Sequence, residues 1–415
     1  MTSREATSVI GLVSGSHVVN HAYLLLFAPA FPLLSADLDV SLAALGVALG
    51  VVNVVVTVFQ LPLGCVSDNY SHGAVLVGSL AVGTVGCALA AVAPDYWWLL
   101  GAAAVMGLGV AGHHPAHYPL ISAAAPDGFR SRAYSAHGFA GALGLALPFA
   151  VVPASVAVGG GWRLAFGAIA ALGAVYTLAA VAAVRRLPES VTRAGALAND
   201  GAMDRLPAGN RRERLRRVIG RLRGYGRTLL AAPLVLLLAA LWFVNSVAAW
   251  GVRAYAATLL EGSYGLAPEP ASLVASAMLV VGAVVLLGGG YVADKIGPMP
   301  MLFVGYGSLV VLATLVSSAL LPVAAAVGVV LLLAATIDIS RPARSTLTDL
   351  ASERKDVGKN FAVITLGVSA GGAVAPPAFG YVIDAANTGV AFFAVAAVAA
   401  LALALSVPVG RLAGQ

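Results

Sequence analysis

Four histidines form two pairs with helical spacing. His17 and His21 are four residues apart, as are His113 and His117, and His114 adjoins the second pair. Residues four apart lie on one face of an α-helix. Imidazole exchanges protons near neutral pH and is a common ligand of transition metals. The spacing therefore predicts proton transfer at His17 and His21, and polar contacts to a substrate at His114 and His117. A metal site formed by His17, His21, His113 and His117 is one alternative, and hydrogen bonding between packed helices is another.

Charged side chains interrupt apolar stretches in the second half of the chain, at Arg253, Asp338, Arg341 and Arg344. A charge at the centre of a bilayer costs about 2.5–3.5 kcal/mol on insertion scales. The last three residues are three apart and would share a helix face, so we expect Asp338 to pair with Arg341 and to take part in proton coupling. The arginines left without a partner could bind carboxylate or phosphonate oxygens, with Asn20 as a further substrate contact. Structural salt bridges are the alternative.

The composition places these residues in a membrane. Of the 415 residues, 60% are hydrophobic and 10% are charged, and the mean hydropathy is +0.92, whereas soluble proteins average about 45–50% apolar and about 25% charged residues. This excludes a soluble enzyme and a nucleic-acid-binding protein. The net charge of +6 arises in the segment 185–227, which holds 12 arginines and 4 acidic residues. Part of this segment has an amphipathic helical pattern that suits the surface of an anionic membrane.

Twelve apolar stretches are long enough to span a bilayer, which needs roughly 20 residues per helix. They cover residues 8–33, 41–66, 74–93, 97–124, 132–156, 163–184, 228–259, 271–292, 299–319, 322–348, 358–382 and 388–409. We read the first stretch as a span and not as a cleaved signal peptide. Lysine and arginine concentrate in alternate connections, which predicts that both termini are cytoplasmic. We expect His72, between the second and third stretches, to lie at the surface.

The two halves of the chain share sequence features at a nearly constant offset. Gly64 and Asp68 end the second stretch as Gly290 and Asp294 end the eighth, and the residues around Pro115 match those around Pro342. Duplicated halves with a binding site between them are typical of secondary transporters. We expect the two glycine–aspartate pairs to act in gating. The predicted parts are a bundle over 1–184, a basic linker over 185–227 and a second bundle over 228–415.

These features resemble the major facilitator superfamily, which has twelve helices in two pseudo-symmetric six-helix bundles and carries a Gly-x-x-x-Asp signature between its second and third helices. A resemblance to its fosmidomycin-resistance-type exporters rests on residues of the first and fourth stretches: His17, Asn20, His21, Tyr23, Pro29, Pro32, Gly112, His114 and Pro115. The resemblance implies that the first, fourth, seventh and tenth helices surround a central cavity. It also implies that the two bundles rock about that cavity.

The sequence therefore predicts an all-α membrane protein, monomeric and multi-pass, in the plasma membrane of a prokaryote. It is expected to export a small anionic solute or drug in exchange for protons, and its partners would be that solute, the proton and the lipid bilayer. Anion/proton symport and efflux of divalent transition metals are the alternatives. We expect no cofactor and no enzymatic activity, because the chain lacks a phosphate-binding Gly-x-x-x-x-Gly-Lys motif and the common hydrolase motifs.

Overall fold

The computed structural model describes residues 3–125, 130–193, 233–351 and 357–413, and these residues form helices and short connections without a β-strand. The helices of the first half are α1 (Ser3–Leu24), η1 (Ala28–Ala30), α2 (Phe31–Leu38), α3 (Leu42–Asn69), α4 (His72–Ala91), α5 (Tyr96–Ala124), α6 (Arg130–Ala157), α7 (Gly161–Val184) and α8 (Glu189–Thr192). Those of the second half are α10 (Pro233–Tyr264), α11 (Pro268–Ile296), α12 (Pro298–Ser317), α13 (Val323–Ile339), α14 (Arg341–Leu350), α15 (Val357–Ala385) and α16 (Thr388–Ala413). Most of the predicted basic linker falls outside the described residues.

The long helices account for the predicted membrane spans. In the described part of the chain, 11 segments are long and apolar enough to cross a bilayer, with α1, η1 and α2 together as the first and α13 and α14 together as another. Helix α5 is not among them, although it has 29 residues. It carries His113, His114 and His117, which make it less apolar. With α5 as the remaining span, the all-helical architecture agrees with the twelve predicted helices.

Two of the spans are broken, which the apolar pattern did not predict. The first span ends as an α-helix at Leu24 and resumes as an α-helix at Phe31. Pro29 and Pro32 lie at this break, and neither has the backbone N–H that a continuous helix would use. The other breaks at Ser340, between α13 and α14. Pro342 has no N–H to donate to the carbonyl of Asp338, and its ring clashes with a continued α-helix. Discontinuous helices in transporters often line binding sites.

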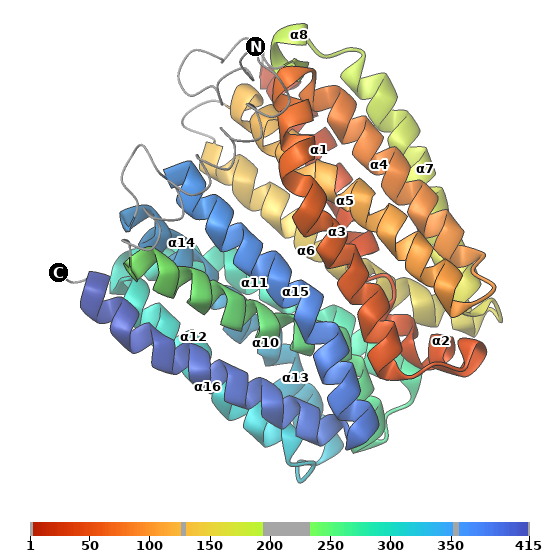
Figure 1. Cartoon of the computed structure of the whole chain (residues 1–415), viewed down its shortest axis with the longest axis vertical. Helices are drawn as coiled ribbons and strands as arrows, with labels where there is room; N and C mark the ends of the chain where they lie inside the picture. The colour runs from red at the N-terminus through yellow and green to blue at the C-terminus, as the bar shows by residue number, and fades with distance from the viewer. Residues whose placement is uncertain (1–2, 126–129, 194–232, 352–356, 414–415) are drawn as a thin grey trace, which may run out of the picture.

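The helices form two lobes. In the N lobe, α1 packs on α5 and α6, α5 on α3 and α4, and α7 on α4 and α6. In the C lobe, α10 packs on α15 and α16, α11 on α13, and α12 on α13 and α16. The main contacts between the lobes join α3 to α15 and α6 to α11. Figure 1 shows the two groups lying close together at the α2 end and spreading apart towards the chain termini.

Polar contacts hold the lobes together at the α2 end. The carboxylate of Asp384, at the end of α15, accepts hydrogen bonds from the backbone N–H groups of Leu42 at 3.1 Å and Ala43 at 2.7 Å, the first residues of α3. Ser272 and Ser276 of α11 donate to backbone carbonyls of α6, at 2.9 and 3.0 Å. Helix α15 also approaches α3 closely at Gly46, where a Cβ atom would clash with the carbonyl of Pro376. The lobes are therefore closed against each other at this end.

Candidate functional site

Six of the seven histidines gather inside the N lobe. His17 and His21 come from α1, His113, His114 and His117 from α5, and His137 from α6. The ring centroid of His17 lies 3.9 Å from that of His21, 4.0 Å from His137, and 5.3 Å from both His113 and His117. The two predicted pairs are thus brought together, and His137 is added to them. No spacing in the sequence pointed to His137, because it stands alone on its helix.

Part of this cluster is a chain of hydrogen bonds in which each donor and acceptor can be assigned. Ser16 Oγ donates to the carbonyl of Val13 and faces Nε2 of His113 at 2.9 Å. His113 therefore donates from Nε2, and its Nδ1 accepts from Nδ1 of His117 at 3.1 Å. Both ring nitrogens of His113 are engaged, so it has no free lone pair for a metal. The predicted metal set that includes His113 and His117 does not agree with this geometry.

The two histidines of α1 make a different arrangement. Nδ1 of His17 lies 2.8 Å from the carbonyl oxygen of His137, and Nδ1 of His21 lies 3.0 Å from that of Gly141, both on α6. A carbonyl oxygen only accepts, so each Nδ1 carries the hydrogen. Only glycine fits at position 141, because a Cβ atom there would clash with the His17 ring. The backbone of α6 thus fixes the orientation of both rings.

In the C lobe, the carboxylate of Asp338 pairs with Arg253 of α10, with Nη2 and Oδ1 3.0 Å apart. The prediction that Asp338 pairs with Arg341 is wrong. Asp338 lies in α13 and Arg341 begins α14, so the break at Ser340 removes the common helix face on which that prediction relied.

Arg344 is 2% exposed and lies among aromatic and polar side chains. Its guanidinium carbon is 4.1 Å from the centre of the Trp242 ring. With the Asn245 amide oxygen turned towards it, Nη1 and Nη2 donate at 2.6 and 3.2 Å. Nε of Arg344 has no hydrogen-bond partner among the residues that the structure describes. Among the described residues, no carboxylate lies within ion-pair distance of Arg344.

Arg341 begins α14 of the C lobe, and its side chain is exposed. It lies within electrostatic range of His21, His114 and Tyr118 of the N lobe and of Arg253 and Arg344 of its own lobe. No carboxylate of the described residues pairs with it. Predicted substrate residues of both lobes therefore lie within electrostatic range of Arg341. The sequence analysis missed Tyr118 and Trp242, which carry no motif.

Asn20 and His117 are fully buried in the N lobe. Asn20 is 0% exposed. Neither of its amide atoms, nor Nε2 of His117, has a hydrogen-bond partner in the described part of the chain. His72 is also buried, and its Nδ1 lies 2.7 Å from Ser67 Oγ. The expectation that His72 lies at the surface is wrong, because it starts α4 and packs against the end of α3.

The predicted gating residues lie at the end where the lobes spread apart. Gly64 faces the Pro115 ring, which a Cβ atom would meet at 3.6 Å, and Asp68 is exposed. Gly290 and Asp294 lie near the end of α11, and their burial and contacts are outside the described part of the structure. Their role stays a prediction.

Comparisons with known proteins agree with this architecture. The profile of the Major Facilitator Superfamily matches residues 13–340. A bacterial homologue of the human lysosomal transporter Spinster, in an inward-facing and unoccupied conformation, superposes with a TM-score of 0.78 at 15% identity, over 99% of this chain and 98% of that chain. A point mutant of the nucleoside transporter NupG superposes with a TM-score of 0.76 at 11% identity, over 98% of this chain and 99% of that one.

Among curated proteins, the inner membrane transport protein YajR of Escherichia coli (strain K12) is 34% identical over 67 residues, which are 16% of this chain and 15% of that protein. The fold is therefore that of a multi-pass membrane transporter and not of an enzyme. The chain belongs to the Major Facilitator Superfamily.

Proposed function

We propose that the protein is a proton-coupled secondary transporter of a small organic anion, which binds between Arg341 and the histidine-bearing face of the N lobe. The observation that carries this proposal is the exposed guanidinium of Arg341, which pairs with no carboxylate of the described residues and lies within electrostatic range of His21 and His114. With Arg344, it leaves two positive charges without carboxylate partners among the described residues. Such charges are costly in a membrane interior unless a ligand or water compensates them. Guanidinium groups bind carboxylates and phosphonates through paired hydrogen bonds.

The ion pair between Arg253 and Asp338 supports a way of coupling anion and proton. When Asp338 is ionised it occupies Arg253, and when it is protonated Arg253 becomes available to the anion. Proton and anion then bind together, which is the requirement for symport. This favours the symport alternative over the predicted exchange of anion for protons, in which the two must compete. Asp338 is one of the three residues predicted to carry the proton, together with His17 and His21.

From the basic connections we infer that the termini and the spread end of the lobes lie in the cytoplasm, which corresponds to an inward-facing state in the plasma membrane of a prokaryote. The conformation of the Spinster homologue, described as inward-facing, supports this inference. We retain the fosmidomycin-resistance-type subgroup as the proposed relationship. We also propose that Asp68 and Asp294, with Gly64 and Gly290, latch the cytoplasmic end when the lobes close there.

Thermal unfolding of the purified protein in the presence of anions tests the binding site. Fosmidomycin, a phosphonate, and simple mono- and dicarboxylates are suitable probes. We expect at least one of them to raise the melting temperature of the wild type and of Arg411→Ala, which removes an arginine near the end of α16, but not of Arg341→Ala. Equal stabilisation of both variants would contradict the proposal.

Proteoliposomes with an imposed pH gradient then test the direction. An anion that binds is expected to accumulate in vesicles whose outside is acidic, because symport moves proton and anion together. Loss of preloaded anion under the same gradient would instead support export by exchange. Transport that does not respond to the gradient would contradict proton coupling.

A further inference from the structure

Two ring nitrogens inside the N lobe carry lone pairs that point at each other. Since Nδ1 of His17 and of His21 both donate to carbonyls of α6, the Nε2 atoms of both neutral rings have no hydrogen. These two Nε2 atoms are only 2.8 Å apart. Two acceptors at this distance repel each other unless a cation lies between or beside them. The arrangement therefore indicates a bound cation, either a proton or a metal ion.

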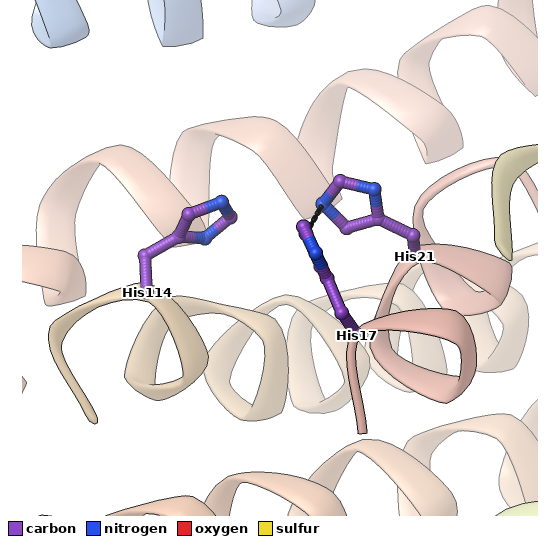
Figure 2. A group of neighbouring side chains, drawn as sticks. All are labelled: His17, His21 and His114. Carbon is purple, nitrogen blue, oxygen red and sulfur yellow. Dashed lines mark hydrogen bonds between the residues drawn. The ribbon is translucent and has the colours of Figure 1, made fainter. Parts of the chain in front are cut away.

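A third nitrogen converges on the same place. Ring nitrogens of His17, His21 and His114 all lie within 4.8 Å of one another. Figure 2 shows the His114 ring, from a separate helix, pointing towards the pair on α1. His114 makes no hydrogen bond with any other described residue, so its lone pair is available. A shared proton would need two nitrogens and would leave the third without a role.

We propose that His17, His21 and His114 bind a divalent transition-metal ion such as Zn²⁺, which leaves Asp338 as the proton carrier among the three predicted residues. Zinc takes imidazole nitrogens at about 2.0–2.1 Å in tetrahedral geometry, which sets neighbouring nitrogens about 3.3 Å apart. The two Nε2 atoms need only separate slightly, and His114 needs to approach them. Three histidines leave the fourth position open, as in zinc sites that also bind water or a small ligand.

The surroundings of the two α1 histidines match those of metal ligands. A metal-bound histidine usually donates its other N–H to a carbonyl or carboxylate, which fixes the ring. The carbonyls of His137 and Gly141 do this for His17 and His21. By contrast, both nitrogens of His113 are used in the chain to Ser16. The structure thus selects His114 instead of the predicted His113 and His117.

The ion is expected to remain in the protein and not to be transported. All three ligands and both supporting carbonyls come from α1, α5 and α6 of the N lobe. A rocking motion of one lobe against the other therefore leaves the site intact. Three neutral imidazoles leave the +2 charge of the ion uncompensated, so the fourth ligand of the bound ion is expected to be an anion.

Isothermal titration of the full-length protein with ZnCl₂ tests the site, after purification through a tag without histidine and removal of bound metal with a chelator. We expect one Zn²⁺ per chain. His114→Ala should weaken binding by at least about 100-fold, the upper end of what losing an outer-shell partner costs. His72→Ala, which removes a histidine outside the cluster, should leave it unchanged. His114 is the variant of choice because its lack of hydrogen bonds makes misfolding less of a concern than at His17.

The proposal is overturned if wild type shows no saturable binding, or if His114→Ala binds as wild type does. It is also overturned if Zn²⁺ accumulates inside proteoliposomes, since the ion would then be a substrate. A second measurement is the melting temperature, which Zn²⁺ should raise in wild type and in His72→Ala but not in His114→Ala. The anion-binding test uses Arg341→Ala in metal-free protein, so the two proposals can fail independently.

Discussion

Asp338 forms its ion pair with Arg253, on another helix, although Arg341 follows it by only three residues. Arg341 lies beyond the break at Ser340, in α14. One arginine of the C lobe is thus neutralised within its own lobe, while Arg341 is exposed and pairs with no carboxylate of the described residues. This division of roles depends on Pro342, which prevents α13 from continuing.

Asp338→Asn should strengthen anion binding. In wild type the carboxylate of Asp338 pairs with Arg253, so an anion must compete with it for this guanidinium. Asparagine carries no charge, and it leaves Arg253 available to the anion. Titration of an identified anion into wild type and into Asp338→Asn at the same pH checks this. An Asp338→Asn variant that binds the anion no more tightly than wild type would show that Arg253 is not part of the anion site.

The same ion pair should also support stability. Arg253→Met alone leaves a mostly buried carboxylate unpaired, and breaking a buried pair typically costs about 3–5 kcal/mol. Because both side chains keep some exposure (17% and 11%), we expect a loss near or below the lower end of this range. The double variant Arg253→Met, Asp338→Leu should recover most of it. Thermal melting of the unliganded variants measures the effect, and an equally unstable double variant would contradict a pairwise interaction.

Asp384→Ala should open the end at which the lobes now meet. Asp384 of the C lobe caps the N-terminus of α3 in the N lobe, and losing a helix cap costs about 0.5–2 kcal/mol. Because the cap forms only when this end is closed, its loss should shift the population towards the opposite state by about 2- to 30-fold. Distances between spin labels on α3 and α15 report this shift. Asp95→Ala, which removes a cap of α5 within one lobe, is the control and should leave the distances unchanged.

Gly141→Ala should displace His17. A Cβ atom at this position clashes with the His17 ring, whereas at Gly138, on the same helix, nothing lies within 4 Å. Overpacking of this kind costs about 1–3 kcal/mol. We expect Gly141→Ala to lower the melting temperature and to weaken Zn²⁺ binding, and Gly138→Ala to do neither. Equal effects of both substitutions would show that any added methyl group on α6 destabilises the protein, and would contradict a specific clash with His17.

Much of the fold could be predicted from the sequence, because apolar stretches and basic connections directly reflect the bilayer. The histidine pairs were also visible, since i, i+4 spacing places two rings on one face whatever the tertiary structure. The set of histidines that would bind the metal could not be predicted from the sequence. The hydrogen bond between His113 and Ser16, and the position of His114 beside the α1 histidines, depend on how α5 is rotated against α1. The predicted partner of Asp338 was wrong for a local reason. The prediction assumed one continuous helix from Asp338 to Arg344, whereas the helix breaks before Pro342.

A substitution of the buried Asn20 should affect anion binding and protein stability in opposite directions. Neither its oxygen nor its nitrogen has a hydrogen-bond partner among the described residues, and a buried polar group without a partner costs about 1–3 kcal/mol. Asn20→Leu should therefore raise the melting temperature of the unliganded protein. If the amide contacts the substrate, as predicted, the same variant should bind the anion at least about tenfold more weakly, which corresponds to about 1.4 kcal/mol. Asn53→Leu is the matched control, because the Asn53 amide already donates to the carbonyl of Leu49 at 3.3 Å, and it should give no stabilisation. An Asn20→Leu protein that is more stable and binds as wild type does would show that Asn20 is not a substrate contact.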